Sequence, residues 1–135
     1  MKVNLRLIHH LTGIITILAF FISGAYMISV FPEIYKSNEI VRYLFRSSHI
    51  YILFSSLLNL GLAGYVTLSE IKWRRRFQIT GSALIVPATI MLIAAFFYEP
   101  GNTMVNRPLT MLAIVLLFLG TISHWVSTLW KPRPE

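Results

Sequence analysis

The chain has 135 residues, of which 56% are apolar and only 13% are charged, and its mean hydropathy is +0.67. This composition lies outside the range of soluble globular proteins, so lipid is expected to be the solvent for most of the chain. The length leaves room for one domain covering residues 1–135. Cysteine is absent, which excludes disulfides, thiolate metal sites and a thiol nucleophile.

The formal net charge is +7, but the basic residues stand at the ends of apolar runs and follow no continuous face. That placement is typical of membrane topology, because anionic headgroups attract basic residues that flank a span. We therefore expect membrane lipid as a partner, together with other membrane subunits or further copies of the chain. No nucleic-acid partner is expected.

Four long runs without a charged residue dominate the sequence. Each is long enough to cross about 30 Å of hydrocarbon as a helix. The runs are Leu7 to Val30, Ser47 to Ser69, Phe77 to Tyr98 and Leu109 to Trp130. The fold class predicted is therefore all-α, an integral membrane four-helix bundle with up-down-up-down topology.

The flanking charges predict how the bundle is oriented. The N-terminus, the second connection and the C-terminal tail must share one side and carry eight of the basic residues, while the other side carries four. Lys and Arg accumulate on the cytoplasmic side, so both termini are predicted to be cytoplasmic, in a bacterial inner (plasma) membrane. On the opposite side, residues 31–46 alternate apolar and charged positions, which indicates an amphipathic segment at the interface.

The four histidines are the ionisable residues within the predicted spans that are candidates for function. An ionisable side chain in a span is costly unless it faces other helices or water, so each is a candidate for function. At 100° per residue, His9 shares a small, polar face with Gly13 and Thr16, and His124 shares one with Gly120. Both histidines are predicted to point into the bundle on the cytoplasmic side.

A single b-type haem is the cofactor that these positions suggest. First and last helices of an up-down bundle are commonly neighbours, and cofactor ligands converge in bundle cores. His124 with either His9 or His10 would supply the two axial imidazoles, with His9 and His124 as the first choice for the iron ligands. Thr121, Thr128 and Thr12 are the expected hydrogen-bond partners of the free ring nitrogens. Purely structural histidines, and proton or metal handling, remain open as alternatives.

Other polar residues occupy the second predicted span. His49 belongs to the opposite, external side, where Met27, Met111 and Met104 would allow a His/Met haem or a copper site. Arg46 and His49 could instead bind a quinone carbonyl or an anionic headgroup. Asn59 is expected to make an interhelical hydrogen bond rather than a substrate contact.

Catalytic signatures are missing. The sequence has no HExxH, Walker or GxSxG pattern, no carboxylate inside a span and no buried Asp partner for a serine triad. No catalytic residue is therefore predicted, and a hydrolase or ATPase is disfavoured.

The four spans with His9 or His10 and His124 resemble small haem b membrane anchors and cytochrome b561-like four-helix electron carriers. The resemblance covers the architecture of the whole chain and only these histidines. It implies electron transfer with a redox partner through one haem, because the external side offers only His49. The alternative is a non-catalytic accessory or assembly subunit of a larger membrane complex, and a third possibility is a small transporter component.

Overall fold

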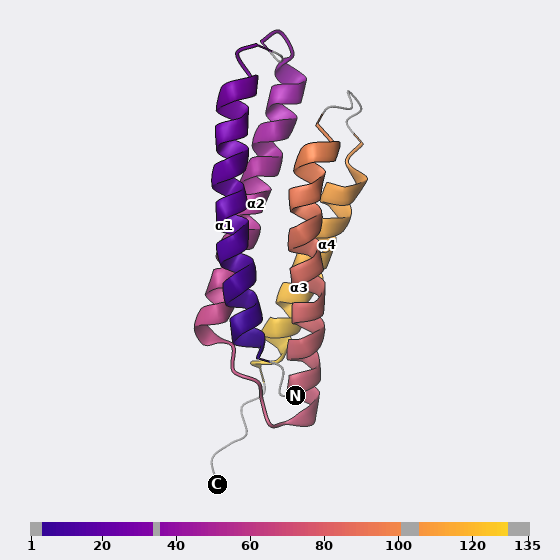
Figure 1. The fold of residues 1–135 in the computed structure, drawn as a ribbon. Helices are drawn as coiled ribbons and strands as arrows, with labels where there is room; N and C mark the ends of the chain where they lie inside the picture. The colour runs from indigo at the N-terminus through magenta and orange to yellow at the C-terminus, as the bar shows by residue number, and fades with distance from the viewer. Residues whose placement is uncertain (1–3, 34–35, 101–105, 130–135) are drawn as a thin grey trace.

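The structure is a computed structural model that describes residues 4–33, 36–100 and 106–129. Within these ranges the chain forms helices and no strand, which confirms the all-α prediction. The helices lie side by side and each reverses the direction of the one before it, so that α1 begins and α4 ends at the same end of the molecule (Figure 1). Their bounds are α1 Leu5–Val30, α2 Glu39–Tyr65, α3 Lys72–Tyr98 and α4 Pro108–Val126.

Three of these helices, α1, α3 and α4, are long and apolar enough to cross a membrane. The second helix is equally long, at 27 residues, but does not reach the same apolarity. Its sequence contains Glu39, Arg42, Arg46 and Asn59 as well as several serines, which lower its hydropathy. Three of the four predicted spans thus meet this criterion.

The second and third helices begin before the predicted starts at residues 47 and 77. The side chain of Asn38 accepts a hydrogen bond from the Val41 amide at 3.1 Å, so a side-chain cap starts α2 at Glu39. Residues 39–46, expected to belong to a separate interfacial segment, therefore form the first turns of α2. Residues 34 and 35 of that segment lie outside the described ranges.

A carboxylate caps the last helix. Pro108 opens α4, and the Glu99 carboxylate from the end of α3 accepts hydrogen bonds from the Leu109 amide at 2.7 Å and the Thr110 amide at 3.2 Å. Arg107 lies 3.5 Å from the same carboxylate. The first amides of a helix have no intrahelical acceptor, so a carboxylate placed there both satisfies them and complements the helix dipole.

The four helices pack as two pairs. The most extensive contacts join α1 to α2 and α3 to α4, and α3 also packs against α1 and α2. Among the described residues α1 and α4 share no extended contact, so the expectation that the first and last helices are direct neighbours is wrong for their backbones. They approach each other through the side chains described below.

Glycines mark where the helices approach most closely. A Cβ added at Gly13 would lie 2.7 Å from the Leu60 side chain, and one at Gly120 would lie 2.8 Å from the carbonyl oxygen of Gly81. A Cβ at Gly24 would lie 3.3 Å from the ring of His49. The predicted contact positions Gly13, Gly24 and Gly120 are therefore confirmed, as expected for small residues in lipid-facing bundles.

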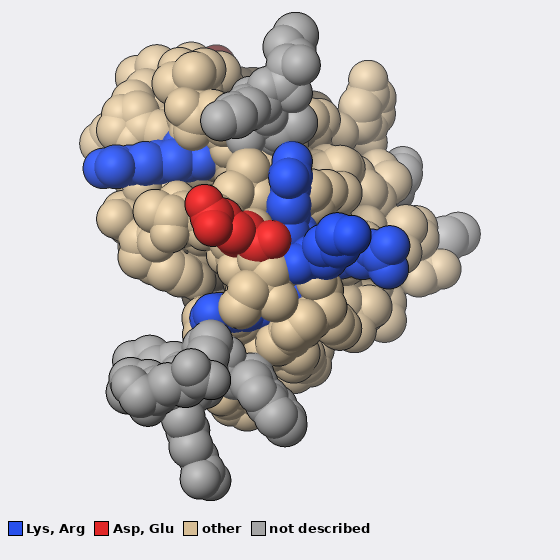
Figure 2. Space-filling view, turned by 90° about the horizontal axis from the view of Figure 1, so that it is seen from below, with Lys and Arg blue, Asp and Glu red and all other residues tan. Residues whose placement is uncertain are grey.

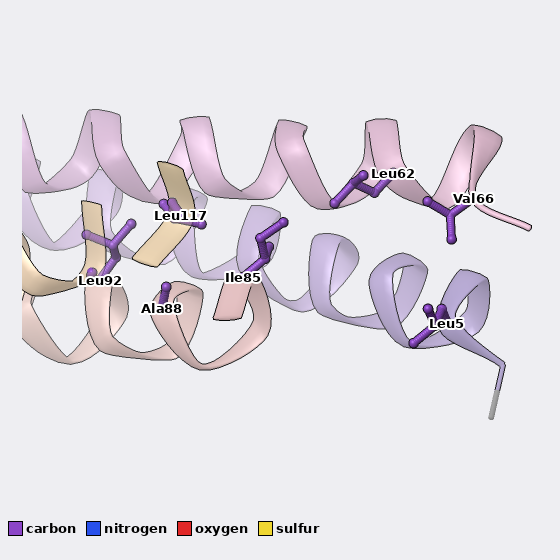
Figure 3. Close-up of a cluster of buried hydrophobic side chains, with 8 residues drawn as sticks. Leu5, Leu62, Val66, Ile85, Ala88, Leu92 and Leu117 are labelled. Carbon is purple, nitrogen blue, oxygen red and sulfur yellow. The ribbon is translucent and has the colours of Figure 1, made fainter. Parts of the chain in front are cut away.

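Two apolar clusters fill the interior. The first includes Leu62, Ile85 and Leu92 and lies between α2, α3 and α4, with Leu5 of α1 at its edge (Figure 3). The second lies toward the other end and consists of Val41, Phe45, Ile52 and Phe96. Between and beside these clusters the structure buries a set of polar side chains, and these form the candidate site.

Candidate functional site

The structure brings His9 and His124 together. His9 of α1 has an exposed fraction of 0% and His124 of α4 one of 2%, so both rings are inside the molecule, as the helix faces predicted. Their ring centroids are 5.7 Å apart and the ring planes meet at 73°. Two helices without extended backbone contact thus meet through a pair of imidazoles.

Ser82 of α3 connects the two rings. Its hydroxyl oxygen lies 2.8 Å from Nε2 of His9 and 3.1 Å from Nε2 of His124. The serine is itself buried, with an exposed fraction of 4%. One hydroxyl therefore hydrogen-bonds to Nε2 of both histidines.

Asn59 of α2 holds the other side of His9. Its Oδ1 lies 2.7 Å from Nδ1 of His9, and its Nδ2 donates to the Ser55 carbonyl at 2.8 Å and to the Thr89 hydroxyl at 3.0 Å. The Asn59 side chain therefore makes the interhelical hydrogen bonds expected of it. A continuous series of hydrogen bonds, here called the histidine relay, includes all four helices through Thr89, Asn59, His9, Ser82 and His124.

Most proton positions in the histidine relay follow from its geometry. A carbonyl can only accept, so the Ser55 carbonyl fixes the Asn59 amide with Oδ1 toward His9, and Nδ1 of His9 must donate. With both rings neutral, Nε2 of His9 then accepts from the Ser82 hydroxyl. Because Ser82 has one proton, Nε2 of His124 must donate to the serine oxygen.

Backbone contact between α3 and α4 brings His124 to Ser82. A Cβ at Gly81 would lie 2.6 Å from Cδ2 of His124 and 2.8 Å from the carbonyl oxygen of Gly120. Only hydrogen atoms fit at these two positions, which lets the helices touch where the histidine relay passes between them. The glycine pair is thus part of the site without taking part in its hydrogen bonds.

The His124 end of the histidine relay opens to a polar pocket of about 220 Å³. The pocket lies at the end of the molecule where α1 begins and α4 ends, and its lining includes His124, Arg74, Gln78 and Ser127. Arg74 donates to the Ser127 carbonyl at 2.6 Å and so fixes one wall. Figure 2 views this end, where Lys and Arg side chains lie around a small acidic patch.

His10 and Arg46, predicted as a haem ligand and an external binding residue, lie apart from the histidine relay. Both side chains are exposed, His10 on α1 and Arg46 on α2. His10 lines a shallow hollow between α1 and α2 with Arg6 and Leu60, so the structure does not bring it to His124.

His49 forms a separate contact. Its ring stacks on Phe20 with centroids 4.0 Å apart, and its Nδ1 lies 2.8 Å from the Ser23 hydroxyl. Ser23 donates to the Phe20 carbonyl, so Nδ1 of His49 donates to Ser23. Of the expected sulfur partners, Met27 packs against the second apolar cluster and Met111 is exposed, while Met104 lies outside the described ranges.

A second polar cluster lies at the end of the molecule opposite the pocket. Arg107 donates to the hydroxyls of Ser47, at 2.7 Å, and Ser48, and pairs with Glu99. The carboxylate also accepts from the hydroxyl of Thr110. This cluster joins α2, α3 and α4.

Sequence reasoning missed two members of the histidine relay and misassigned other partners. Thr121 and Thr128, expected beside His124, are exposed, and Thr12 accepts through its carbonyl from Thr16 instead. Ser82 and Thr89 take their place from α3. The available signal was the buried face of that helix, where Ser82, Ile85, Thr89, Leu92 and Phe96 recur at the spacing of one helical stripe.

A haem between His9 and His124 would need a different arrangement of these side chains. An iron held by two axial imidazoles needs both nitrogens aimed at it from opposite faces of the porphyrin. Here Ser82 lies between the nitrogens and hydrogen-bonds to both, and the Gly81–Gly120 contact closes the space beside His124. A porphyrin does not fit this packing unless α3 moves away. Among the described residues no three His, Asp or Glu side chains are grouped so as to hold a metal ion.

The chain matches no model of a protein family, no curated protein and no solved structure. The likeness to haem-binding membrane carriers therefore rests on architecture and on His9, His10 and His124 alone. Function has to be inferred from the geometry of the histidine relay.

Proposed function

We propose that this chain is a multi-pass protein of the bacterial inner membrane, a four-helix bundle with both termini in the cytoplasm. Support comes from the three helices that are long and apolar enough to cross a membrane, and from the eight basic residues assigned to the side of the termini against four on the other side. In this orientation the pocket beside His124 faces the cytoplasm.

The histidine relay is proposed to be a proton acceptor reached from the cytoplasmic side. The observation that carries this proposal is the unbroken hydrogen bonding from His124 through Ser82 to His9, beginning at a polar pocket. Imidazole is the side chain that gains and loses a proton near neutral pH, and a serine hydroxyl can pass one on. Neither ring needs to move for the transfer.

The transfer balances without any further reactant. A proton binds Nδ1 of His124, and the proton on Nε2 of His124 passes to the Ser82 oxygen. The original hydroxyl proton of Ser82 passes to Nε2 of His9. His9 is then an imidazolium ion, His124 is neutral with its proton on Nδ1, and Ser82 is again a hydroxyl.

The histidine relay ends inside the molecule. Beyond His9 it continues through Asn59 to Thr89, whose hydroxyl donates back to the Ile85 carbonyl at 3.0 Å. Ile52 and Phe96, with exposed fractions of 1% and 0%, lie in the second apolar cluster beyond it. The chain therefore holds a proton rather than carrying it across the membrane.

A hydrolase is not supported, although Ser82, His9 and Asn59 are connected like a serine, histidine and amide triad. Ser82 lies in the interior of α3, so the helix already uses the backbone amides that an oxyanion hole would need. Its oxygen also accepts from His124, and Ser82 lines none of the pockets described here.

A proton held inside the bundle can have a function only if a neighbouring protein responds to its charge. We therefore assign the chain as an accessory subunit of a larger membrane complex, with the histidine relay as its proton-sensitive centre. The proposed function joins two alternatives that the sequence left open, an accessory subunit and histidines that handle a proton.

Hydrogen–deuterium exchange at the histidine ring nitrogens, followed by NMR in lipid bilayers, tests this function. Solvent deuterium should reach His124 first and His9 through Ser82. Ser82→Ala should slow exchange at His9 by roughly tenfold or more while leaving His124 fast, because a lost hydrogen bond of about 1.4 kcal/mol corresponds to that factor. Ser82→Thr keeps a hydroxyl and should restore the rate.

Ser56→Ala is the matched control, because Ser56 is also buried and donates to the Gly13 carbonyl at 3.0 Å without belonging to the histidine relay. It should leave both histidines unchanged. If exchange at His9 is as fast in Ser82→Ala as in the wild type, the proton function is overturned and the histidines have a packing role only.

Bis-histidine haem b is the second candidate, favoured by the 5.7 Å approach of His9 and His124. It requires that Ser82 leave the space between the nitrogens, and it would make the chain an electron-transfer subunit with a redox partner. Protein expressed with ample haem provides the test. A Soret band that His124→Ala abolishes and His49→Ala preserves would establish this candidate and overturn the proton function, whereas colourless protein supports the histidine relay.

A further inference from the structure

The outer surface of the α1–α2 seam is hollowed near the cytoplasmic end. One hollow, of about 530 Å³, is lined by Arg6 and His10 of α1 and by Leu60, Ala63 and Gly64 of α2. A second hollow, of about 730 Å³, includes Arg6 as well and extends around the end of the bundle to Arg75. The linings of the two hollows have Asn4 and Arg6 in common.

Two glycines of α2 lie on the same side of the molecule without any role inside it. A Cβ added at Gly61 or Gly64 would meet nothing within 4 Å, whereas one at Gly13 or Gly81 would collide with a neighbouring helix. Glycine within a helix costs roughly 0.5–1 kcal/mol relative to alanine, and nothing within this chain offsets that cost at Gly61 or Gly64. The missing side chain at Gly64 instead deepens the first hollow.

Charge and polarity change across the first hollow. Its α1 side carries the exposed side chains of Arg6 and His10, and the described residues include no ion pair of Arg6. Its α2 side is apolar and is formed by Leu60, Ala63 and Gly64. An anionic group on the first side and a hydrocarbon chain on the second would match this surface.

We propose that the hollow between Arg6, His10 and Gly64 binds one anionic phospholipid, with its phosphate at Arg6 and His10 and an acyl chain over Gly64. The phosphate lies on the His10 side of Arg6, because the second hollow already holds a carboxylate, that of Glu70, together with Arg6 and Arg75. Basic hollows between helices on the cytoplasmic side are suited to such headgroups. The proposal rests on the membrane location and orientation proposed above.

Native mass spectrometry of the full chain, released from micelles that contain equal phosphatidylglycerol and phosphatidylcholine, tests this site. The wild type should retain phosphatidylglycerol in preference. Arg6→Gln should lower that preference roughly fivefold, the factor expected for one basic residue at an anionic surface. Gly64→Leu should remove the bound lipid of either kind, since it fills the hollow without changing the charge.

Arg76→Gln is the matched control, because Arg76 is an exposed arginine at the same end of the molecule and lines neither hollow. It should leave the preference unchanged. Equal retention of the two lipids by the wild type, or an equal loss in Arg76→Gln and Arg6→Gln, would overturn the site. A cross-linked dimer that Gly64→Leu abolishes would assign the hollow to a second copy of the chain and would also overturn it. Release of the chain from membranes by alkaline carbonate would instead contradict the membrane location itself.

Discussion

The side-chain amide of Asn59 bonds to three partners in the bundle. It accepts from His9 and donates to the Ser55 carbonyl and the Thr89 hydroxyl, and its own exposed fraction is 0%. A buried polar group without a partner loses its hydration without compensation, which is more costly than a completed hydrogen bond is favourable. Asn59 therefore stabilises the histidine relay mainly by satisfying Nδ1 of His9.

Asn59→Leu should lower the free energy of unfolding by about 1–3 kcal/mol, because it leaves the Nδ1 proton of His9 buried and unpaired. Thr16→Val is the comparison. Thr16 is buried to the same degree but bonds only to the Thr12 carbonyl within its own helix, so its loss should cost less. Denaturation in detergent measures both variants, and equal losses would show that Asn59 does not complete the histidine relay.

For single residues, the sequence predicted which way a side chain faces better than it predicted the hydrogen-bond partner of that side chain. Helical periodicity was enough to turn His9 and His124 inward, and the lack of other ionisable residues in the spans singled them out. It could not choose Ser82 as their common partner, because the rotation of α3 depends on its contact with α4 at Gly81. The sequence also left His10 as an alternative to His9, although its side chain is exposed.

A single added methyl group should destabilise the molecule most at the contact between α3 and α4. Gly81→Ala would place its Cβ 2.6 Å from His124 and 2.8 Å from the Gly120 backbone oxygen, so one helix must move. Overpacking of this kind costs roughly 1–3 kcal/mol. We expect Gly81→Ala to unfold more readily in detergent and to weaken the hydrogen bond between Ser82 and His124.

Gly61→Ala is the control for that prediction, since nothing lies within 4 Å of its added Cβ. Replacing an exposed helix glycine with alanine should leave stability equal or raise it by roughly 0.5–1 kcal/mol. If Gly81→Ala is as stable as Gly61→Ala, the two helices do not touch at the glycine pair and the placement of His124 beside Ser82 is wrong.

Helix existence was readable from the sequence, but helix bounds were not. Uncharged runs located the apolar parts of α1, α3 and α4 because lipid excludes charge from a span. The same rule cut α2 and α3 short, since both continue as helix through charged residues at their first turns. The Asn38 cap shows why for α2, because a hydrogen bond from its side chain to an amide sets the start of the helix, and such bonds do not follow hydropathy.

The whole molecule has a charge asymmetry that predicts its orientation. Reporter fusions after Arg74 and at Glu135 should both report the cytoplasm, whereas a fusion after Lys36 should report the external side, because eight basic residues flank the first side and four the second. An external C-terminus would overturn this arrangement. It would also turn the pocket beside His124 away from the cytoplasm.

The histidine relay is defined by two protons, one on each of its imidazole rings. Nitrogen-15 NMR of histidine-labelled chain in bilayers, at a pH where the rings are neutral, reports which ring nitrogen carries a proton. The histidine relay predicts that His9 is protonated at Nδ1, toward Asn59, and His124 at Nε2, toward Ser82. A neutral His9 protonated at Nε2, or two rings carrying the signature of iron ligation, would contradict it.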